Sequence, residues 1–220
     1  MFIKNTERDY VLEVSYELDE EDIRYLEANP IEEGDDWYKS KYKFIKDKIR
    51  NFLETNQPQF CPFCRTKLEI HGSNYYNHIE HLVSKSNKIK FMFKGNNLVL
   101  SCPCCNSKKN QSDTLVDSST EFYPLNSGGF NIVHPYFDKF SDYIFYDEAD
   151  GFKAVDGNNK GSNTIGAYSL NRIKLREKLE KDILNKSNTS STAQDVLNLI
   201  NTMDKEEQDK LIASIKDKIL

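Results

Sequence analysis

The sequence reads CPFC at residues 61–64, NHIEH at 77–81 and NLVLSCPCCNSKKN at 97–110, and these fifty residues decide the fold. Two Cys-x-x-Cys pairs bracket an acidic residue that a histidine follows directly. The rest of the 220-residue chain is interpreted as scaffold around this stretch. The residues that carry the interpretation are Cys61, Cys64, Glu80, His81, Cys102 and Cys105.

The paired cysteines predict a structural zinc site. A Cys-x-x-Cys pair lets two thiolates reach one ion from a single tight turn, and two such pairs complete a tetrahedral shell around Zn²⁺. Pro62 and Pro103 lie inside the pairs, where a fixed φ suits the turn. The alternative, four unrelated buried cysteines, does not explain the paired spacing. Cys104, between the members of the second pair, is expected to be a free thiol.

The order of these motifs resembles that of the zinc-stapled HNH nucleases. Those proteins have a Cys-x-x-Cys pair, an acid-histidine pair, a central asparagine, and a second Cys-x-x-Cys pair followed at once by a metal-binding residue. Here the central asparagine is Asn97 and the last position is Asn106. The resemblance implies an α+β fold class with a ββα-metal core. In that core the acid-histidine pair lies at a strand end and the second metal ligand lies on the following helix.

The chemistry of Glu80 and His81 indicates what such a site does. Hydrolysis of a phosphodiester needs an activated water, neutralised phosphate charge and help for the leaving oxygen, which one divalent ion and one general base supply together. Glu80 offers a hard oxygen ligand, and His81 is the candidate base, because neutral imidazole near pH 7 accepts a proton. Neighbouring side chains on a strand point to opposite faces, so we expect the pair where the strand bends. His78 is interpreted as a packed or solvated residue.

The resemblance assigns roles to the two asparagines. It implies that Asn97 pins the loop that holds the base, and that Asn106 is the second metal ligand at a position where many members have histidine. With oxygen ligands from both Glu80 and Asn106, the site is expected to favour Mg²⁺ or Mn²⁺. Ser84 stands where the family usually has proline, which is expected to loosen the turn without removing activity.

The charge distribution places basic residues beside this centre. The chain carries a net charge of −5, but residues 61–110 carry +6 and the other 170 residues therefore carry −11. Binding to a phosphate backbone requires such a local surplus. Lys85, Lys108 and Lys109 are the candidate nucleic-acid contacts, and DNA rather than RNA follows from the resemblance alone. A helix is predicted at 36–54, with Asp35 or Asp36 as its cap. Its expected apolar face consists of Trp37, Tyr42, Ile45, Ile49, Phe52 and Leu53. The helix also adds a basic stripe that either extends the basic surface or is a solvated face. The stripe consists of Lys39, Lys43, Lys46 and Arg50.

The pattern along the chain predicts four parts. An acidic N-terminal flank of net charge −10 covers residues 1–36, and as a default it is interpreted as a solvated flank. A helix and the HNH nuclease core cover 37–120, a hairpin and helix extension covers 121–184, and a linker with a C-terminal helical segment covers 185–220. The elements expected in the flanks are a strand at 10–16, a helix at 17–29, a hairpin of 143–146 with 152–155, and a helix that Asn163 or Thr164 caps.

The remaining expectations concern partners and location. Without a membrane-length apolar run or a signal-peptide pattern, the chain is expected to be cytoplasmic and to have no membrane partner. FYPL at 122–125, HPYFD at 134–138 and TIGAYSLNR at 164–172 resemble the HNH subunits of bacterial anti-phage defence systems, the Septu and retron-linked nucleases. This implies an ATPase partner subunit, and apolar residues near the C-terminus allow a homo-oligomer. The alternative is a zinc-stapled nucleic-acid-binding or protein-docking module whose nuclease centre has decayed.

Overall fold

The computed structural model combines helices with small antiparallel sheets. It describes residues 9–68, 70–71, 74–75, 77–155, 157, 159–185, 201, 203–205 and 208–209. The chain divides into two compact units, which are described separately. The first contains residues 1–148 and 152–170, and the second contains 149–151 and 171–220. All the cysteines and all the candidate site residues belong to the first unit.

The N-terminal segment forms a helix but not the predicted strand. Helix α1 (Glu20–Ala28) begins at Asp19, whose side chain accepts the backbone N–H of Asp22 in a capping box. The strand predicted at 10–16 is wrong. This segment is extended, but it does not pair with a described strand to form a sheet. The backbone N–H of Leu12 donates a hydrogen bond of 2.8 Å to the carbonyl oxygen of Pro135.

Helix α2 begins later than predicted. Two 3-10 turns, η2 (Gly34–Tyr38) and η3 (Ser40–Tyr42), precede α2 (Lys43–Asn56). The buried side chain of Asp36 explains the difference, because it accepts the backbone N–H of Glu32 at 2.9 Å and pairs with Lys39. Asp36 thus holds a tight turn instead of capping a long helix. From α2 onward the apolar face packs inward as predicted, through Ile45, Ile49 and Leu53.

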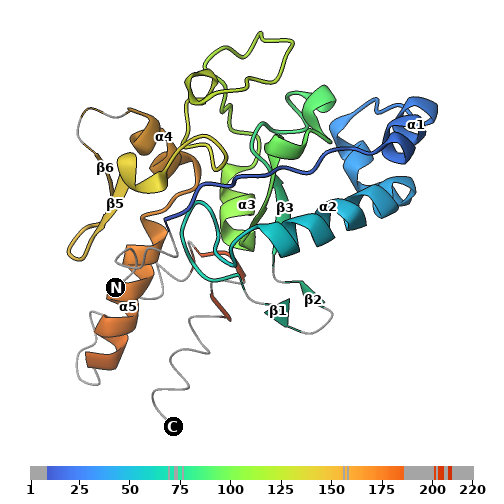
Figure 1. The fold of residues 1–220 in the computed structure, drawn as a ribbon. Helices are drawn as coiled ribbons and strands as arrows, with labels where there is room; N and C mark the ends of the chain where they lie inside the picture. The colour runs from blue at the N-terminus through green and yellow to red at the C-terminus, as the bar shows by residue number, and fades with distance from the viewer. Residues whose placement is uncertain are drawn as a thin grey trace. The chain divides into compact units, whose positions relative to one another are not determined.

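The central element is an antiparallel strand pair followed by a helix. Strand β3 (His78–His81) pairs with β4 (Leu98–Ser101), so that Glu80 lies opposite Val99 and His81 opposite Leu98. Helix α3 (Pro103–Lys109) follows β4 directly and packs against β3, while α2 packs against β4 (Figure 1). The other short elements here are β1 (Ile70–His71) paired with β2 (Asn74–Tyr75), and the 3-10 turns η4 (Ile89–Phe91) and η5 (Gly95–Asn97).

The downstream elements include the predicted hairpin and a divided helix. Strands β5 (Ile144–Asp147) and β6 (Gly151–Ala154) pair as expected, with Gly151 at φ +90° where glycine is favoured. The helix predicted from Asn163 or Thr164 begins earlier, as α4 (Asn159–Ala167), and is interrupted by Ser169 at φ +47°. The elements not yet named are η6 (Ser127–Gly129), η7 (Phe140–Asp142) and, in the second unit, α5 (Arg172–Asn185).

The last two expectations concern the C-terminal segment and membrane crossing. The linker and apolar helical segment predicted over 185–220 lie almost wholly outside the described residues. Among the helices that the structure describes, none is both long and apolar enough to cross a membrane.

Candidate functional site

The four paired cysteines meet at one point of the fold. Their sulfur atoms all lie within 4.8 Å of one another, and the Sγ atoms of Cys64 and Cys102 are 3.6 Å apart. A tetrahedral ion at Zn–S distances of about 2.3 Å would hold its sulfurs about 3.8 Å apart. The cluster therefore fits a structural Zn²⁺ ion, as the spacing predicted. Cys104 is buried but does not belong to this cluster. The cluster consists of Cys61, Cys64, Cys102 and Cys105.

Local hydrogen bonds shape both cysteine turns. In the first turn the N–H of Arg65 donates to the carbonyl oxygen of Cys61 at 2.9 Å, and Arg65 adopts φ +58°, which closes the turn. In the second turn Cys102 is the N-cap of α3, and its Sγ accepts the N–H of Cys105 at 3.4 Å. Burial raises the pKa of the Cys105 thiol well above its usual range, and a bound cation would reverse this shift. The cluster thus fixes the start of the helix that carries Asn106 and Lys109.

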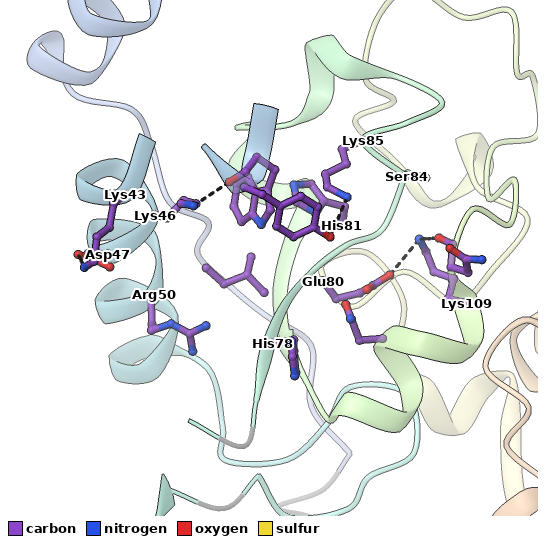
Figure 2. A pocket seen from close by; sticks show the side chains of 15 residues that line it. Lys43, Lys46, Asp47, Arg50, His78, Glu80, His81, Ser84, Lys85 and Lys109 are labelled. Atoms are coloured by element: carbon purple, nitrogen blue, oxygen red, sulfur yellow. Dashed lines mark hydrogen bonds and ion pairs between the residues drawn. The ribbon is translucent and has the colours of Figure 1, made fainter. Parts of the chain in front are cut away.

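An open pocket of about 360 Å³ lies between α2 on one side and β3 with α3 on the other. Figure 2 shows Lys43, Lys46, Asp47 and Arg50 along α2, on one side of the pocket. Glu80 and Lys109 lie next to each other on the opposite side. The basic stripe of α2 therefore shares one pocket with the acid-histidine pair, although Lys39 does not line it. The lining residues are Trp37, Tyr38, Lys43, Lys46, Asp47, Arg50, His78, Ile79, Glu80, His81, Ser84, Lys85, Asn106, Lys109 and Asn110.

Glu80 forms a buried ion pair with Lys109. Its Oε1 lies 2.9 Å from Nζ of Lys109, and the two side chains are 6% and 1% exposed. Burial raises the pKa of Glu80 to about 7, and the positive charge of Lys109 opposes the shift. Apart from this ion pair, Oε1 has no well-directed hydrogen bond to any residue that the structure describes. A buried carboxylate oxygen paired with a cation in this way is suited to binding a metal ion.

His81 is buried and held in one tautomer. Its Nε2 lies 3.1 Å from the carbonyl oxygen of Met92, and the edge of the ring packs against Trp37 with the centroids 4.5 Å apart. A carbonyl oxygen only accepts, so the neutral ring carries its hydrogen on Nε2 and keeps a lone pair on Nδ1. Burial, together with the positive charges of Lys85 and Lys109, lowers the pKa of His81 to about 3. The imidazole is therefore neutral at pH 7.

Asn97 ties together the loop that follows His81. Its Oδ1 accepts the N–H of Val83 at 2.7 Å, and its Nδ2 donates to the carbonyl oxygens of Val83 and Phe91 at 3.1 and 2.9 Å. Asn97 is fully buried and does not line the pocket. This is the geometry expected of a residue that pins the loop and touches no metal, while its catalytic importance stays a prediction.

Asn106 completes a possible oxygen-ligand set. It lies three residues before Lys109 on α3, and both line the pocket with Glu80. A side-chain amide oxygen and a carboxylate oxygen are hard ligands that suit Mg²⁺ or Mn²⁺, with water filling the other positions. These residues fit such an ion, provided that the ammonium of Lys109 yields its place beside Glu80.

The remaining predicted residues differ in their exposure and in whether they line the pocket. Lys85 lines the pocket, and its Nζ lies 4.9 Å from the ring centroid of Tyr38. Lys109, predicted as a phosphate contact, is instead buried and engaged with Glu80. Lys108 is partly exposed and lies outside the pocket lining. His78 is exposed and lines the pocket, so the interpretation as a solvated residue agrees with its position.

Sequence reasoning missed a chain of hydrogen bonds behind the site. Nδ1 of His134 accepts the N–H of Tyr136 at 3.3 Å, so its Nε2 donates to the hydroxyl of Tyr123 at 3.0 Å. That hydroxyl donates in turn to the carbonyl oxygen of Asn96 at 2.9 Å, next to Asn97. The motifs FYPL and HPYFD therefore brace the loop that Asn97 pins. The local sequence around Tyr123 and His134 did not indicate the contact with Asn96, because that contact joins segments that are distant in the chain.

Trp37 is a second residue whose role the sequence did not reveal. Helical spacing placed it on the apolar face of α2, whereas the structure places it in η2, with its ring against His81 and its carbonyl oxygen bound to Lys46 Nζ at 2.7 Å. Trp37 thus connects the basic stripe of α2 to the candidate base.

Comparison with models of protein families gives no match, and comparison with curated proteins gives none either. The assignment of a function therefore depends on the geometry of the site itself.

Proposed function

We propose that this protein is a metal-dependent HNH endonuclease with a ββα-metal core, which hydrolyses phosphodiester bonds of DNA. The observation that carries the proposal is that Glu80, His81 and Asn106, from β3 and α3, line one pocket walled by the lysines and arginine of α2. The antiparallel pair β3–β4 followed by α3 has the order of elements that this core requires. Four clustered cysteines at the start of α3 supply its zinc site.

In this proposal each residue has a distinct task. Nδ1 of His81 takes the proton of the attacking water, since Nε2 is engaged with Met92. Glu80 and Asn106 hold the divalent ion, which when bound neutralises charge on the phosphate and the leaving oxygen. Lys85 contacts a neighbouring phosphate at the pocket rim. The low pKa of His81 keeps its Nδ1 unprotonated at pH 7 and therefore able to accept a proton.

The wider context is proposed from the same resemblance. A nuclease of this kind would act as the effector of an anti-phage defence system beside an ATPase partner subunit. Part of the negative charge of the N-terminal flank is neutralised within the chain, because Lys48 of α2 pairs with Asp19 and Asp22.

One observation favours the second candidate, a nucleic-acid-binding module with a decayed nuclease centre. Lys109 already pairs with Glu80 in the interior, so the buried carboxylate has a compensating charge without a catalytic metal ion. Such a module would bind nucleic acid through the walls of the pocket and would not cut it with any divalent ion.

Cleavage of labelled DNA by the purified full-length chain with Mg²⁺ or Mn²⁺ separates the two candidates. We expect cleavage by the wild type and a loss of at least about 100-fold in His81→Ala, as for removal of a general base. His78→Ala is the matched control, because His78 lines the same pocket but is exposed, and it should keep most of the activity. Equal cleavage by both variants would remove His81 from the mechanism, and no cleavage by the wild type would favour the binding module.

A further inference from the structure

The rim of the pocket carries an exposed aromatic ring. Tyr38 is 71% exposed and lines the pocket together with Glu80 and His81. Nζ of Lys85 lies 4.9 Å from the centroid of this ring and 3.5 Å from its hydroxyl oxygen, so this cation sits towards the hydroxyl end of the ring. The high exposure of the residue leaves a face of the ring open to solvent. A single exposed tyrosine is ordinary, and its position beside the candidate centre is what gives it meaning.

The backbone around Tyr38 packs against His81 and the segment that follows it. The preceding Trp37 is buried with its ring against His81. Gly34, at the start of η2, lies so close to Ser86 that an added Cβ would be 3.0 Å from the Cα of Ser86. The ring of Tyr38 is therefore carried by a turn that packs on the segment after His81. A platform held in this way loses little conformational freedom when a ligand stacks on it.

Cations line two parts of the same pocket. Lys43, Lys46 and Arg50 belong to the α2 wall, and Figure 2 shows Lys85 apart from them, at the rim. Positive side chains lining a groove with an exposed aromatic ring are the combination by which proteins bind unpaired nucleic acid. The cations follow the phosphates, while the ring stacks on a base. Stacking on an internal base of a duplex is blocked, because both faces of that base are already covered by its neighbours.

We propose that the pocket takes an unpaired polynucleotide strand, in which the ring of Tyr38 stacks on a nucleobase next to the phosphate bound beside Glu80 and His81. This inference rests on the proposed function insofar as the pocket must bind nucleic acid. It adds the substrate class, namely a strand whose bases are free to leave their stack. The pocket volume of about 360 Å³ is that of a site for a ligand-sized group such as one nucleotide.

Binding without catalysis tests this inference. The 220-residue chain, purified with zinc and without other added divalent ions, would be titrated into fluorescent oligonucleotides of about 12 nucleotides. The three probes are single-stranded DNA, single-stranded RNA and a DNA duplex of the same sequence. Tyr38→Ala should weaken binding of at least one unpaired probe by about 5- to 100-fold and leave duplex binding unchanged. Tyr38→Phe keeps the ring and should bind like the wild type.

Phe122→Ala is the matched control, because Phe122 is an aromatic residue that is 84% exposed and does not line the pocket. It should leave all binding unchanged. Comparison of the two unpaired probes shows whether the strand is DNA or RNA. Duplex binding as tight as that of both unpaired strands, absence of binding to any probe, or equal behaviour of Tyr38→Ala and Phe122→Ala would overturn the inference.

The outcomes also separate this inference from the proposed function. If unpaired strands bind through Tyr38 but no divalent ion supports cleavage, the hydrolysis proposal fails and the stacking site stands. If unpaired strands are cleaved equally well by wild type and Tyr38→Ala, the nuclease stands and the stacking site fails.

Discussion

The buried Lys109 is paired with the carboxylate of Glu80, which the proposed catalytic ion needs as a ligand. The ammonium of Lys109 lies 2.9 Å from Glu80, and both side chains are almost completely buried. A divalent ion that binds Glu80 must therefore compete with a positive charge already in place. Lys109 has its nearest alternative partner in the carbonyl oxygen of Asn110, at 3.3 Å.

Removal of this competitor should tighten metal binding. We expect Lys109→Met to raise the affinity for Mn²⁺ by about 10-fold at pH 8, since the ion no longer has to displace the ammonium of Lys109. Titration calorimetry with Mn²⁺ measures this. Lys108→Met is the control, because Lys108 lies outside the pocket, and Glu80→Gln should abolish the binding in either background. Unchanged or weaker binding in Lys109→Met would show that Lys109 does not compete for the ion.

His134 should make the stability of the protein depend on pH. Burial lowers its pKa to about 3; Asp138 opposes the shift and Lys160 adds to it. Its ring also contacts the hydroxyl of Tyr123. The folded-state pKa lies below the unfolded value of about 6.5, so the unfolded chain binds the proton first. The stabilisation by neutral His134 is therefore complete above pH 6.5 and is lost as the pH falls towards 3.

Urea unfolding at pH 7.5 and pH 5 measures this contribution. Between these values His134 should account for a loss of about 2 kcal/mol in the free energy of unfolding. His134→Phe, although less stable at pH 7.5, should show a pH dependence smaller by that amount. The same pH dependence in both proteins would mean that His134 is protonated, or accessible to protons, in the folded state.

At the scale of elements, the loop between β3 and β4 depends on one asparagine. Asn97→Ala removes three hydrogen bonds from buried backbone groups of Val83 and Phe91, so we expect a loss of about 2 to 4 kcal/mol in urea unfolding. Asn96→Ala is the matched control, because the side-chain Oδ1 of Asn96 has no hydrogen-bond partner among the described residues and its removal should cost much less. Equal losses in both variants would contradict the proposed clamp.

Helix α3 depends on the cysteine cluster. Cys105→Ser should reduce the zinc content, measured by elemental analysis, from about one ion per chain to a small fraction and should destabilise α3, because three thiolates hold Zn²⁺ more weakly than four. Cys104→Ser tests the specificity of this effect, since Cys104 does not belong to the cluster, and it should keep the zinc. Loss of zinc in Cys104→Ser and retention in Cys105→Ser would reverse the ligand assignment.

Local patterns explain which elements could be predicted. The zinc cluster, α1 and the β5–β6 hairpin follow from spacing, capping and turn residues that act within a few positions of the chain. The start of α2 could not be predicted in this way. Asp36 is a good helix cap by type, but its carboxylate is buried in a tight turn that also positions Trp37 against His81. A contact between distant segments overrides local preference there.

The same distinction holds for the candidate site. Glu80, His81, Asn97 and Asn106 were located by the order of their motifs, and the structure brings three of them to one pocket. The sequence did not indicate that Lys109 would be buried against Glu80. A lysine next to Lys108 on a short helix is usually solvated, and only the packing of α3 on β3 decides its position.

At the scale of the whole molecule, charge is separated between a basic pocket and acidic flanks. The net charge of −5 conceals a surplus of +6 in residues 61–110, and α2 adds further cations to the same pocket. Part of the acidic excess near the N-terminus is neutralised by Lys48, on the other side of α2 from the pocket-lining stripe. The molecule thus presents its positive potential where the proposed phosphate lies, which favours binding of a polyanion despite its overall negative charge.

The central proposal is that His81 is the base of a hydrolytic reaction. The most direct measurement is cleavage of labelled single-stranded and duplex nucleic acid with Mn²⁺ by His81→Ala, with and without added imidazole. We predict that the wild type cleaves, that His81→Ala does not, and that imidazole restores part of the activity because it enters the space of the missing ring. The same addition should not rescue Glu80→Gln. Full activity of His81→Ala without imidazole would contradict the assignment.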